Sequence, residues 1–481
     1  MLLTNIPEEL LDIIVHRVDR GSLKVLRLTS KLFERLASAL IWDRIWISSH
    51  PLDLAVFKRV TASRFARNIR ELVWDDTTLQ RPLMNWENFV NVCELGHPLR
   101  RGAKYSPTRE AFEIWHDIAS KHHFNRTLHE DLNALTAALP RLENLTRIVL
   151  TNRNVEPIPH EDDVPEYGSS PTVRFWRHLP ERLPLPPSVC WYTDSYAAWD
   201  SLGDMVDIDY LDDALPDISF HGAIENARPF RGLVILLHAL DAQRAIGRGP
   251  TIKEFVIRPS YEPSTTSEPG ISLLFFQRSS VKMTQMTSLF ENLRVLNLVI
   301  SNGLHKALGL SVTRNGNIAH CLRAARSLED LTLELDTMPI LFEGPSNTRI
   351  TGAMDPNFAY GKLRKVTFIY GEFHSEVLVQ WLQNQPVLQD VHLYKCSMDW
   401  PRTAETRKSW KDLLYELKHE KLPYESFVIE DCTSSTDFFY NNAHRPKEQI
   451  KDFVLKDGPC PIDVSKEEWI TERFRTYDKY Y

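Results

Sequence analysis

Few stretches of this sequence combine residue types and spacing that could do chemistry. The run His160–Asp163 carries metal-ligating side chains, but consecutive residues in a proline-rich loop do not converge on one ion. Asp207, Asp209, Asp212 and Asp213 could supply paired carboxylates, but no pocket signal accompanies them, which favours a solvated acidic loop. His122, His123 and His129 lie in a polar, helical-looking stretch and are expected to face solvent.

The motifs that cradle phosphates or activate a nucleophile are absent. The sequence contains no G-x-x-x-x-G-K-[ST], no G-x-G-x-x-G and no G-x-S-x-G. We therefore predict a protein that is not an enzyme, with no cofactor, no metal and no catalytic residue. An enzyme built on a βαβ sheet, with residues 151–230 as a lid, is the less favoured alternative.

Composition is that of an ordinary globular protein. The chain has 481 residues, of which 43% are hydrophobic and 25% charged. Because the net charge is -7, neither nucleic acid nor an anionic membrane is the expected partner. The 6 cysteines include no C-x-x-C pair, which is typical of thiols in a reducing compartment. Without a secretion signal or an apolar run of bilayer length, we expect an intracellular protein of the cytoplasm, the nucleus or both.

Residues 6–47 predict three short helices. A first helix is expected from Pro7, which precedes two glutamates and a stripe of aliphatic residues at helical spacing, and it should end at Gly21. Ser22 can cap a second helix and Ser30 a third. So small a bundle buries too little apolar surface by itself. Its surplus apolar surface must cover either the rest of this chain or another protein.

Composition alone would favour a terminal helical cap, but the order of these residues resembles the F-box motif. Three signatures carry the resemblance: a Pro-Glu-x-Leu-Leu opening at 7–11, a Ser-Lys-x-Phe turn at 30–33 and Leu-x-Trp at 40–42. In that family the module docks on a Skp-type adaptor, which links it to a cullin-RING ubiquitin ligase. The resemblance implies adaptor contacts by Pro7, Leu10, Leu11, Ile14, Leu26, Ser30, Lys31 and Phe33.

A repeated L-x-x-L-x-L pattern predicts buried strands along the rest of the chain. Five copies begin at Leu293, Leu328, Leu363, Leu388 and Tyr424, and three weaker copies begin at Ile69, Leu145 and Ile252. Helices are expected between strands, at 317–326, 375–383 and 403–420. Cys396 and Cys432 occupy the position where such a repeat takes Asn or Cys, and we expect them to be structural. This self-similarity favours a stacked array over an ordinary α/β domain with a parallel sheet.

The predicted fold class is α/β, with an N-terminal three-helix F-box followed by an irregular leucine-rich-repeat-like βα solenoid with a Pro/Asp-rich insertion. The predicted domains are the helical module at 1–47, linker helices and first repeats at 48–150, the insertion at 151–250 and the array with its C-terminal cap at 251–481. Residues beside the strand leucines should form the open face that binds partners. The expected target-binding residues are Asn297, Thr332, Glu334, Thr367, Ile369, His392, Tyr394 and Glu430.

The chain thus resembles F-box proteins with leucine-rich-repeat-like C-terminal regions, of the divergent kind frequent in fungi. The resemblance implies a substrate-recognition subunit of an SCF-type cullin-RING ubiquitin ligase. The module would bind the Skp-type adaptor and the array an unidentified target protein, while catalysis would come from proximity. A scaffold that binds the adaptor outside any ligase is the alternative. The 151–230 stretch fits a solvated loop and a partner-binding segment equally well.

Overall fold

A computed structural model gives the fold of the protein in two compact units. Unit 1 comprises residues 1–275 and 284–289, and unit 2 comprises 276–283 and 290–481. The structure describes residues 6–76, 78–79, 85–87, 90, 108–151, 188–189, 231–258, 271–272, 276, 287–301, 317–335, 353–398, 410–420, 424–430, 432, 447–456, 458 and 460. The run His160–Asp163, the aspartates between 204 and 217 and residues 152–187 and 190–230 of the predicted insertion lie outside these residues.

Unit 1 begins with a helical module formed by α1 (Glu8–Val15), α2 (Arg20–Leu26) and α3 (Lys31–Ile41). Its core consists of Leu11, Val15, Leu23, Phe33, Leu36, Ala37 and Ile41. Ser30 caps α3 as predicted, because its hydroxyl oxygen accepts from the Phe33 amide at 3.3 Å. The cap predicted for the second helix is wrong. Asp19, not Ser22, caps α2, since its carboxylate accepts from the Ser22 amide at 3.0 Å, and Gly21 lies inside that helix.

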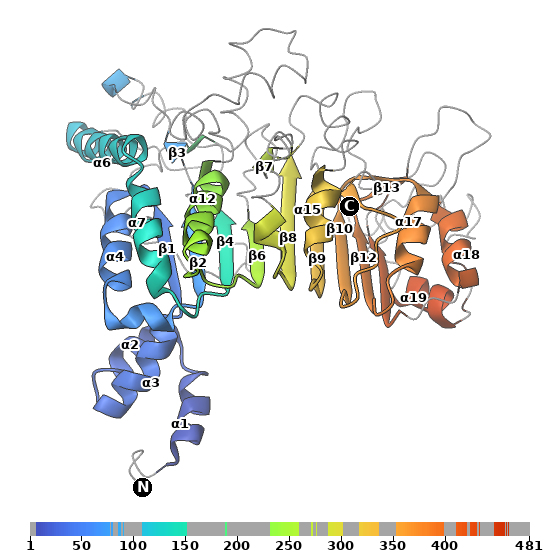
Figure 1. The fold of residues 1–481 in the computed structure, drawn as a ribbon, viewed down its shortest axis with the longest axis horizontal. Helices are drawn as coiled ribbons and strands as arrows, with labels where there is room; N and C mark the ends of the chain where they lie inside the picture. The colour runs from blue at the N-terminus through green and yellow to red at the C-terminus, as the bar shows by residue number, and fades with distance from the viewer. Residues whose placement is uncertain are drawn as a thin grey trace, which may run out of the picture. The chain divides into compact units, whose positions relative to one another are not determined.

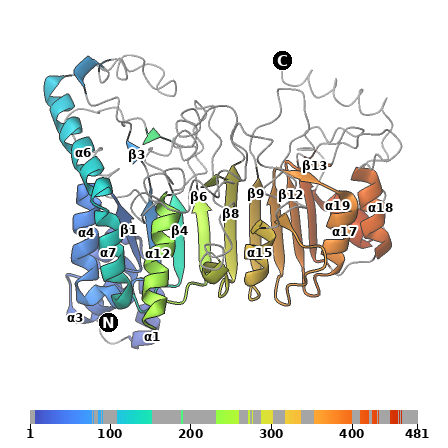
Figure 2. The same cartoon turned by 45° about the horizontal axis from the view of Figure 1, so that its top comes forward.

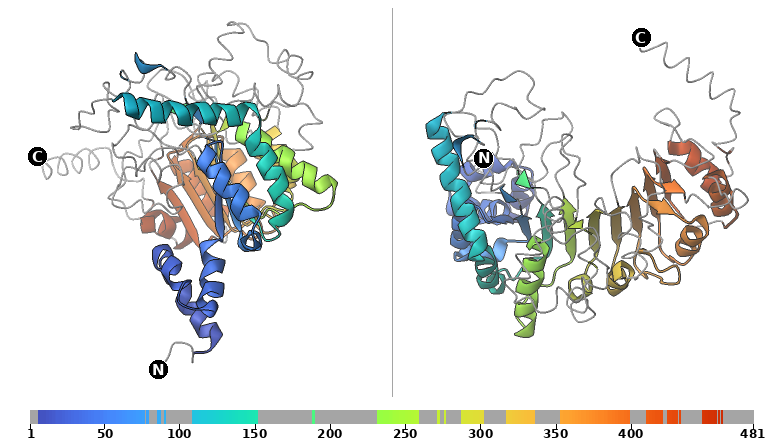
Figure 3. Two further views of the ribbon diagram at one scale, coloured as in Figure 1. Left: turned by 90° about the vertical axis from the view of Figure 1, so that its left-hand side faces the viewer. Right: turned by 90° about the horizontal axis from the view of Figure 1, so that it is seen from above.

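The rest of unit 1 is a parallel sheet with helices on one face. Strands β1, β2, β4 and β6 pair in that order, and α4, α7 and α12 lie in front of them in Figure 1. The module lies beyond the amino-terminal ends of β1 and β2, and α6 crosses near their carboxyl ends (Figure 3, left). The bounds are β1 Arg44–Ser48, α4 Pro51–Thr61, η2 Arg64–Asn68, β2 Glu71–Asp75, β3 Thr78–Leu79, α6 Arg109–Thr127, α7 Glu130–Ala138, η4 Leu139–Arg141, β4 Arg147–Thr151, β5 Ser188–Val189, α12 Arg231–Ala245, β6 Glu254–Arg258 and β7 Ile271–Ser272.

Both faces of the unit 1 sheet are apolar. Leu72, paired with Ile148 on the next strand, belongs to the buried row that the repeated pattern predicts. On the opposite face Val73, Val149 and Val256 form a separate cluster with Trp46. A parallel sheet buried on both sides is the usual outcome when strands are rich in Val, Ile and Leu.

Unit 2 continues the same strand-helix alternation. Strands β8, β9, β10, β12 and β14 pair in that order and run parallel, and α15, α17, α18 and α19 lie on one face of them (Figures 1 and 2). The short strands β11 and β13, which follow β10 and β12 in the chain, pair in parallel and form a separate two-stranded sheet. The bounds are β8 Val295–Ser301, α15 Asn317–Ala324, β9 Asp330–Leu335, β10 Lys365–Ile369, β11 Glu372–Phe373, α17 Ser375–Gln383, β12 Asp390–Tyr394, β13 Ser397–Met398, α18 Trp410–Glu420, β14 Ser426–Glu430 and α19 Lys447–Lys456.

The predicted α/β class is confirmed, and each of the eight sequence copies coincides with a strand. Within each unit the copies also align, as Leu331 does with Leu296 on one side and Val366 on the other. A ninth copy, Trp42-x-x-Ile45-x-Ile47, was not predicted and forms β1. The insertion predicted at 151–250 includes α12, which is apolar and buried, so its last part belongs to the packed fold.

None of the described helices is long and apolar enough to cross a membrane.

Candidate functional site

The helical module of unit 1 leaves large aliphatic side chains in water. Leu10 is 50% exposed, Ile13 55%, Ile14 47%, Val25 66% and Leu28 78%. The three on α1 follow the i, i+3, i+4 spacing that places them on one face of the helix. Isolated exposed aliphatics are common, but this many in so small a bundle mark an interaction surface.

The structure separates the eight predicted adaptor contacts by exposure. Leu11 and Phe33 are buried in the module core, so their role is to hold the helices together. Leu26 packs partly against that core, and Ser30 is the half-buried cap of α3. The remaining predicted residues, Pro7, Leu10, Ile14 and Lys31, are exposed. Ile13, Val25 and Leu28 are also exposed but were not among the predicted contacts, because sequence spacing alone does not show which side of a short helix is covered.

The module is joined closely to the rest of unit 1. Helix α3 ends one residue before Trp42, whose ring stacks on Phe65 of η2 at 5.5 Å between centroids. Arg64, from the same 3-10 helix, forms an ion pair with Glu34 of α3 and lies over the Phe65 ring. These contacts fix the direction in which the module leaves the sheet.

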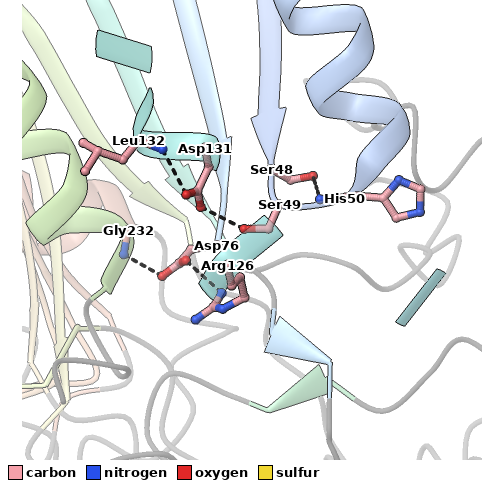
Figure 4. Close-up of polar contacts among 8 residues, drawn as sticks. All are labelled: Ser48, Ser49, His50, Asp76, Arg126, Asp131, Leu132 and Gly232. Atoms are coloured by element: carbon pink, nitrogen blue, oxygen red, sulfur yellow. Dashed lines mark hydrogen bonds and ion pairs between the residues drawn. The ribbon is translucent and has the colours of Figure 1, made fainter. Parts of the chain in front are cut away.

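Buried polar residues gather at the carboxyl ends of β1 and β2, where ligands often bind in parallel sheets (Figure 4). Asp76 accepts from the Gly232 amide in the first turn of α12 at 2.8 Å, and Arg126 lies 3.4 Å from the same carboxylate. A Cβ on Gly232 would meet Asp76 at 2.8 Å, so only glycine fits there. The Asp76 carboxylate therefore fixes α12 against the end of β2, with the helix dipole in its favour.

Ser48, the last residue of β1, and Ser49, which follows it, make similar contacts. The Ser48 hydroxyl donates to Asp53 of α4 at 2.7 Å, and the Ser49 hydroxyl donates to Asp131 of α7 at 2.8 Å. Asp131 also accepts from the Leu132 amide at 2.9 Å (Figure 4). Both hydroxyls thus donate to carboxylates that belong to helix starts. This arrangement positions loops and helices around the end of the sheet.

Histidines of this region are buried, contrary to expectation. His122 and His129 are buried in unit 1 rather than facing solvent, and His123 is half-buried. His50 accepts from the Leu52 amide through Nδ1 at 3.2 Å and so caps α4. Burial lowers the pKa of His50 to about 4, because the charged imidazolium is poorly solvated there.

In unit 2 the predicted target-binding residues form two rows across the strands. Pairing aligns Asn297, Thr332, Thr367 and His392 in one row and Glu334, Ile369, Tyr394 and Glu430 in the next. Thr367 and Glu334 are buried, whereas the other six are half-buried. The more accessible end of these rows is formed by β12 and β14, since β8, β9 and β10 each place a buried residue in one of the two rows.

A lysine and two tyrosines cluster beside that end. Lys395 Nζ donates to Tyr370 Oη at 3.2 Å and lies 4.9 Å from the centroid of the Tyr394 ring. Tyr370 and Lys395 follow β10 and β12 directly, and both have a φ of 51°. On the neighbouring strands, His392 Nε2 lies 3.4 Å from Glu430 Oε2. Tyr370 and Lys395 were not predicted, since they follow the strands rather than belong to the repeated pattern.

The two cysteines expected to be structural are fully buried. The Cys396 amide donates to Cys432 Sγ at 3.3 Å, and the Cys396 thiol contacts the carbonyl oxygen of Phe368 at 3.4 Å. Burial raises the pKa of the Cys396 thiol well above its usual range. These contacts join successive strands, so the structural expectation is confirmed.

No protein-family model matches this sequence, and no curated protein does. Among the residues that the structure describes, no group of three or more His, Cys, Asp or Glu side chains could hold a metal ion.

Proposed function

We propose that this protein is the substrate-recognition subunit of an SCF-type cullin-RING ubiquitin ligase. Its N-terminal module binds a Skp-type adaptor, and its strand array holds a target protein. The chain itself does no bond chemistry. It brings a target lysine near a charged ubiquitin carrier and so raises the effective concentration of the two reactants.

The observation that carries this proposal is the contrast in exposure on one short helix. Leu11 and Val15 close the module core, while Leu10, Ile13 and Ile14 of the same helix lie about half in water. Completing the burial of one such side chain would stabilise a complex by roughly 1 kcal/mol, because a fully buried Leu or Ile contributes about 1.5–3 kcal/mol. A partner that covers the exposed set would therefore bind with useful affinity.

Two further features support the proposal. The exposed set includes Leu10 and Ile14, two residues that the F-box resemblance places at the adaptor. At these two positions the sequence motif and the exposed surface of α1 point to the same contact. The stack of Trp42 on Phe65 and the Arg64–Glu34 ion pair fix the module to unit 1. A fixed attachment suits a subunit that works by holding its cargo in place.

The experiment is affinity purification of the tagged full chain, followed by detection of Skp-type adaptor and cullin. Wild type should recover both proteins. The double variant Leu10→Asp/Ile14→Asp should lose both, because it places charges on the exposed face of α1 without touching the core.

The matched control is Ile246→Asp, which alters an equally exposed isoleucine outside the module. It should recover adaptor and cullin as wild type does. Recovery of adaptor by the double variant would overturn the docking assignment. Recovery of adaptor without cullin by wild type would reject the ligase role and favour a scaffold that binds the adaptor alone.

A further inference from the structure

The accessible end of the unit 2 strand face carries a lysine whose position is fixed by its neighbours. Lys395 Nζ lies over the rings of Tyr370 and Tyr394, at 5.3 and 4.9 Å from their centroids, and donates to Tyr370 Oη at 3.2 Å. The two rings are 6.5 Å apart. An ammonium group held over aromatic rings is already ordered, so little conformational entropy is lost when it binds an anion.

The backbone contributes to this order. Tyr370 and Lys395 adopt the left-handed conformation, which is strained for a non-glycine residue, and Gly371 follows with a φ of 110°. The paired short strands β11 and β13 begin two residues after Tyr370 and Lys395 and hold both turns. The two side chains are therefore presented from equivalent positions of adjacent strands.

Within the described part of the chain, no ion pair joins Lys395 to a carboxylate. Burial opposes protonation, but hydrogen bonding to Tyr394 and Tyr370 outweighs it and raises the pKa of the ammonium. The group is half-buried, so it stays reachable from solvent. A protonated lysine between tyrosines, with Ile369 beside it, offers N–H donors next to an apolar border, and tyrosine is among the residues enriched in the hot spots of protein interfaces.

We infer that this cluster, formed by Ile369, Tyr370, Tyr394 and Lys395, binds an acidic peptide segment of the target, with a carboxylate accepting from Lys395 Nζ. The inference deepens the proposed function. It rests on that function only in assigning the peptide to a protein that the ligase ubiquitinates. A carboxylate fits better than a phosphate, because the cluster offers one cation to balance its single charge. Glu430 on the next strand would repel a phosphate, with nearly two negative charges, more strongly than a carboxylate.

The test begins with selection from a phage-displayed library of random 12-residue peptides on the immobilised full chain. Sequencing should show Asp and Glu enriched over the input library. The enrichment should disappear with Lys395→Gln and persist with Lys362→Gln, which alters an exposed lysine of the same unit. An output without acidic enrichment, an empty output, or enrichment that survives Lys395→Gln would overturn the inference.

A synthetic copy of the most enriched peptide then gives the magnitude by fluorescence anisotropy. The Kd should rise about 10- to 150-fold with Lys395→Gln, the range expected for a charge-assisted hydrogen bond, and should stay unchanged with Lys362→Gln. Replacing the essential acidic residue by phosphoserine should weaken binding. Tighter binding of the phosphopeptide would overturn the choice of a carboxylate.

The module variant Leu10→Asp/Ile14→Asp separates this inference from the proposed function. It should bind the acidic peptide as wild type does, since its changes lie in unit 1 and the cluster lies in unit 2. Peptide binding by a wild-type protein that recovers no adaptor would reject the ligase role and leave the peptide site standing. Adaptor recovery by a wild-type protein that selects no acidic peptide would reject the peptide site and leave the adaptor-binding role standing.

Discussion

At the scale of single residues, adjacent side chains of α1 have opposite roles. Leu10 is half-exposed and Leu11 is 1% exposed, because successive helical residues point about 100° apart. The sequence identifies both as aliphatic residues of an amphipathic helix, but it does not show which of them the other two helices cover. Only the packing of α2 and α3 settles that.

Alanine substitutions should separate these roles. Leu11→Ala should destabilise the module by about 2–5 kcal/mol, since it leaves a cavity in a core of few residues, and Leu10→Ala should change stability by less than about 0.5 kcal/mol. Hydrogen–deuterium exchange of residues 8–41 in the full chain measures the difference. Equal protection in the two variants would contradict the assignment of Leu11 to the core.

His50 should make unit 1 sensitive to acid. Its folded pKa of about 4 lies below the ordinary 6.5, so the unfolded chain binds the proton more readily between these values. The contribution of neutral His50 to the free energy of unfolding is fully present above pH 6.5. It is lost progressively as the pH falls toward 4, by up to about 3 kcal/mol. Protonation would also remove the Nδ1 acceptor that caps α4.

The measurement is amide exchange of residues 50–61 at pH 7.5 and pH 5, corrected for the intrinsic effect of pH on exchange. His50→Asn can still cap the helix but does not titrate in this range. Its protection should depend less on pH than that of wild type. The same pH dependence in both proteins would show that another group is responsible.

At the scale of elements, charge orders the strands of unit 1. Register places Arg44, Glu71, Arg147 and Glu254 side by side, with alternating sign, at the starts of four parallel strands. Arg44 lies 3.0 Å from Glu71, and Arg147 lies 3.0 Å from Glu254. Exchanging the places of β2 and β4 in the sheet would put Arg44 beside Arg147 and Glu71 beside Glu254. The row of alternating charges therefore favours the observed order of the strands.

Glu71→Gln should therefore destabilise unit 1 by about 2 kcal/mol or more, because a largely buried carboxylate between two arginines is removed. The control Glu143→Gln removes an exposed carboxylate 4.0 Å from Arg67 and should cost less than about 0.5 kcal/mol. Urea unfolding followed by exchange at β2 and β4 measures both. Equal effects would show that the row does not stabilise the sheet.

The strands that carry the leucine repeat could be predicted from sequence, whereas a strand whose copy departs from the pattern was missed. The eight predicted copies are strands because the pattern alternates apolar residues in the way a buried strand requires. Strand β1 was missed since its copy starts with Trp42 and uses isoleucines. The cap of α2 was misplaced because Asp19 and Ser22 are both good capping residues, and only the geometry distinguishes them.

The polar cluster at the ends of β1 and β2 could not be predicted either. Its contacts join residues far apart in the chain, such as Ser49 with Asp131 and Asp76 with Gly232. Nothing in the local sequence around His122 or His129 distinguishes a buried histidine from a solvated one. Burial of this kind depends on which loops the fold brings together.

At the scale of the whole molecule, the proposed function needs two surfaces on one chain. The exposed aliphatic residues of the module belong to unit 1, and the lysine–tyrosine cluster belongs to unit 2. The resemblance of residues 7–42 to the F-box motif suggested the first surface. The second was only partly predicted, because the strand rows name Tyr394 and Ile369 but not the residues that follow the strands.

The most direct measurement is titration of the purified full chain with a purified Skp-type adaptor, by isothermal titration calorimetry repeated at several temperatures. Wild type and Ile246→Asp should bind with the same Kd and a negative heat-capacity change, as burial of apolar surface requires. Leu10→Asp/Ile14→Asp should bind at least about 100-fold more weakly, since it loses two apolar contacts and buries two charges. Equal affinity in all three proteins, or no binding by wild type, would contradict the account.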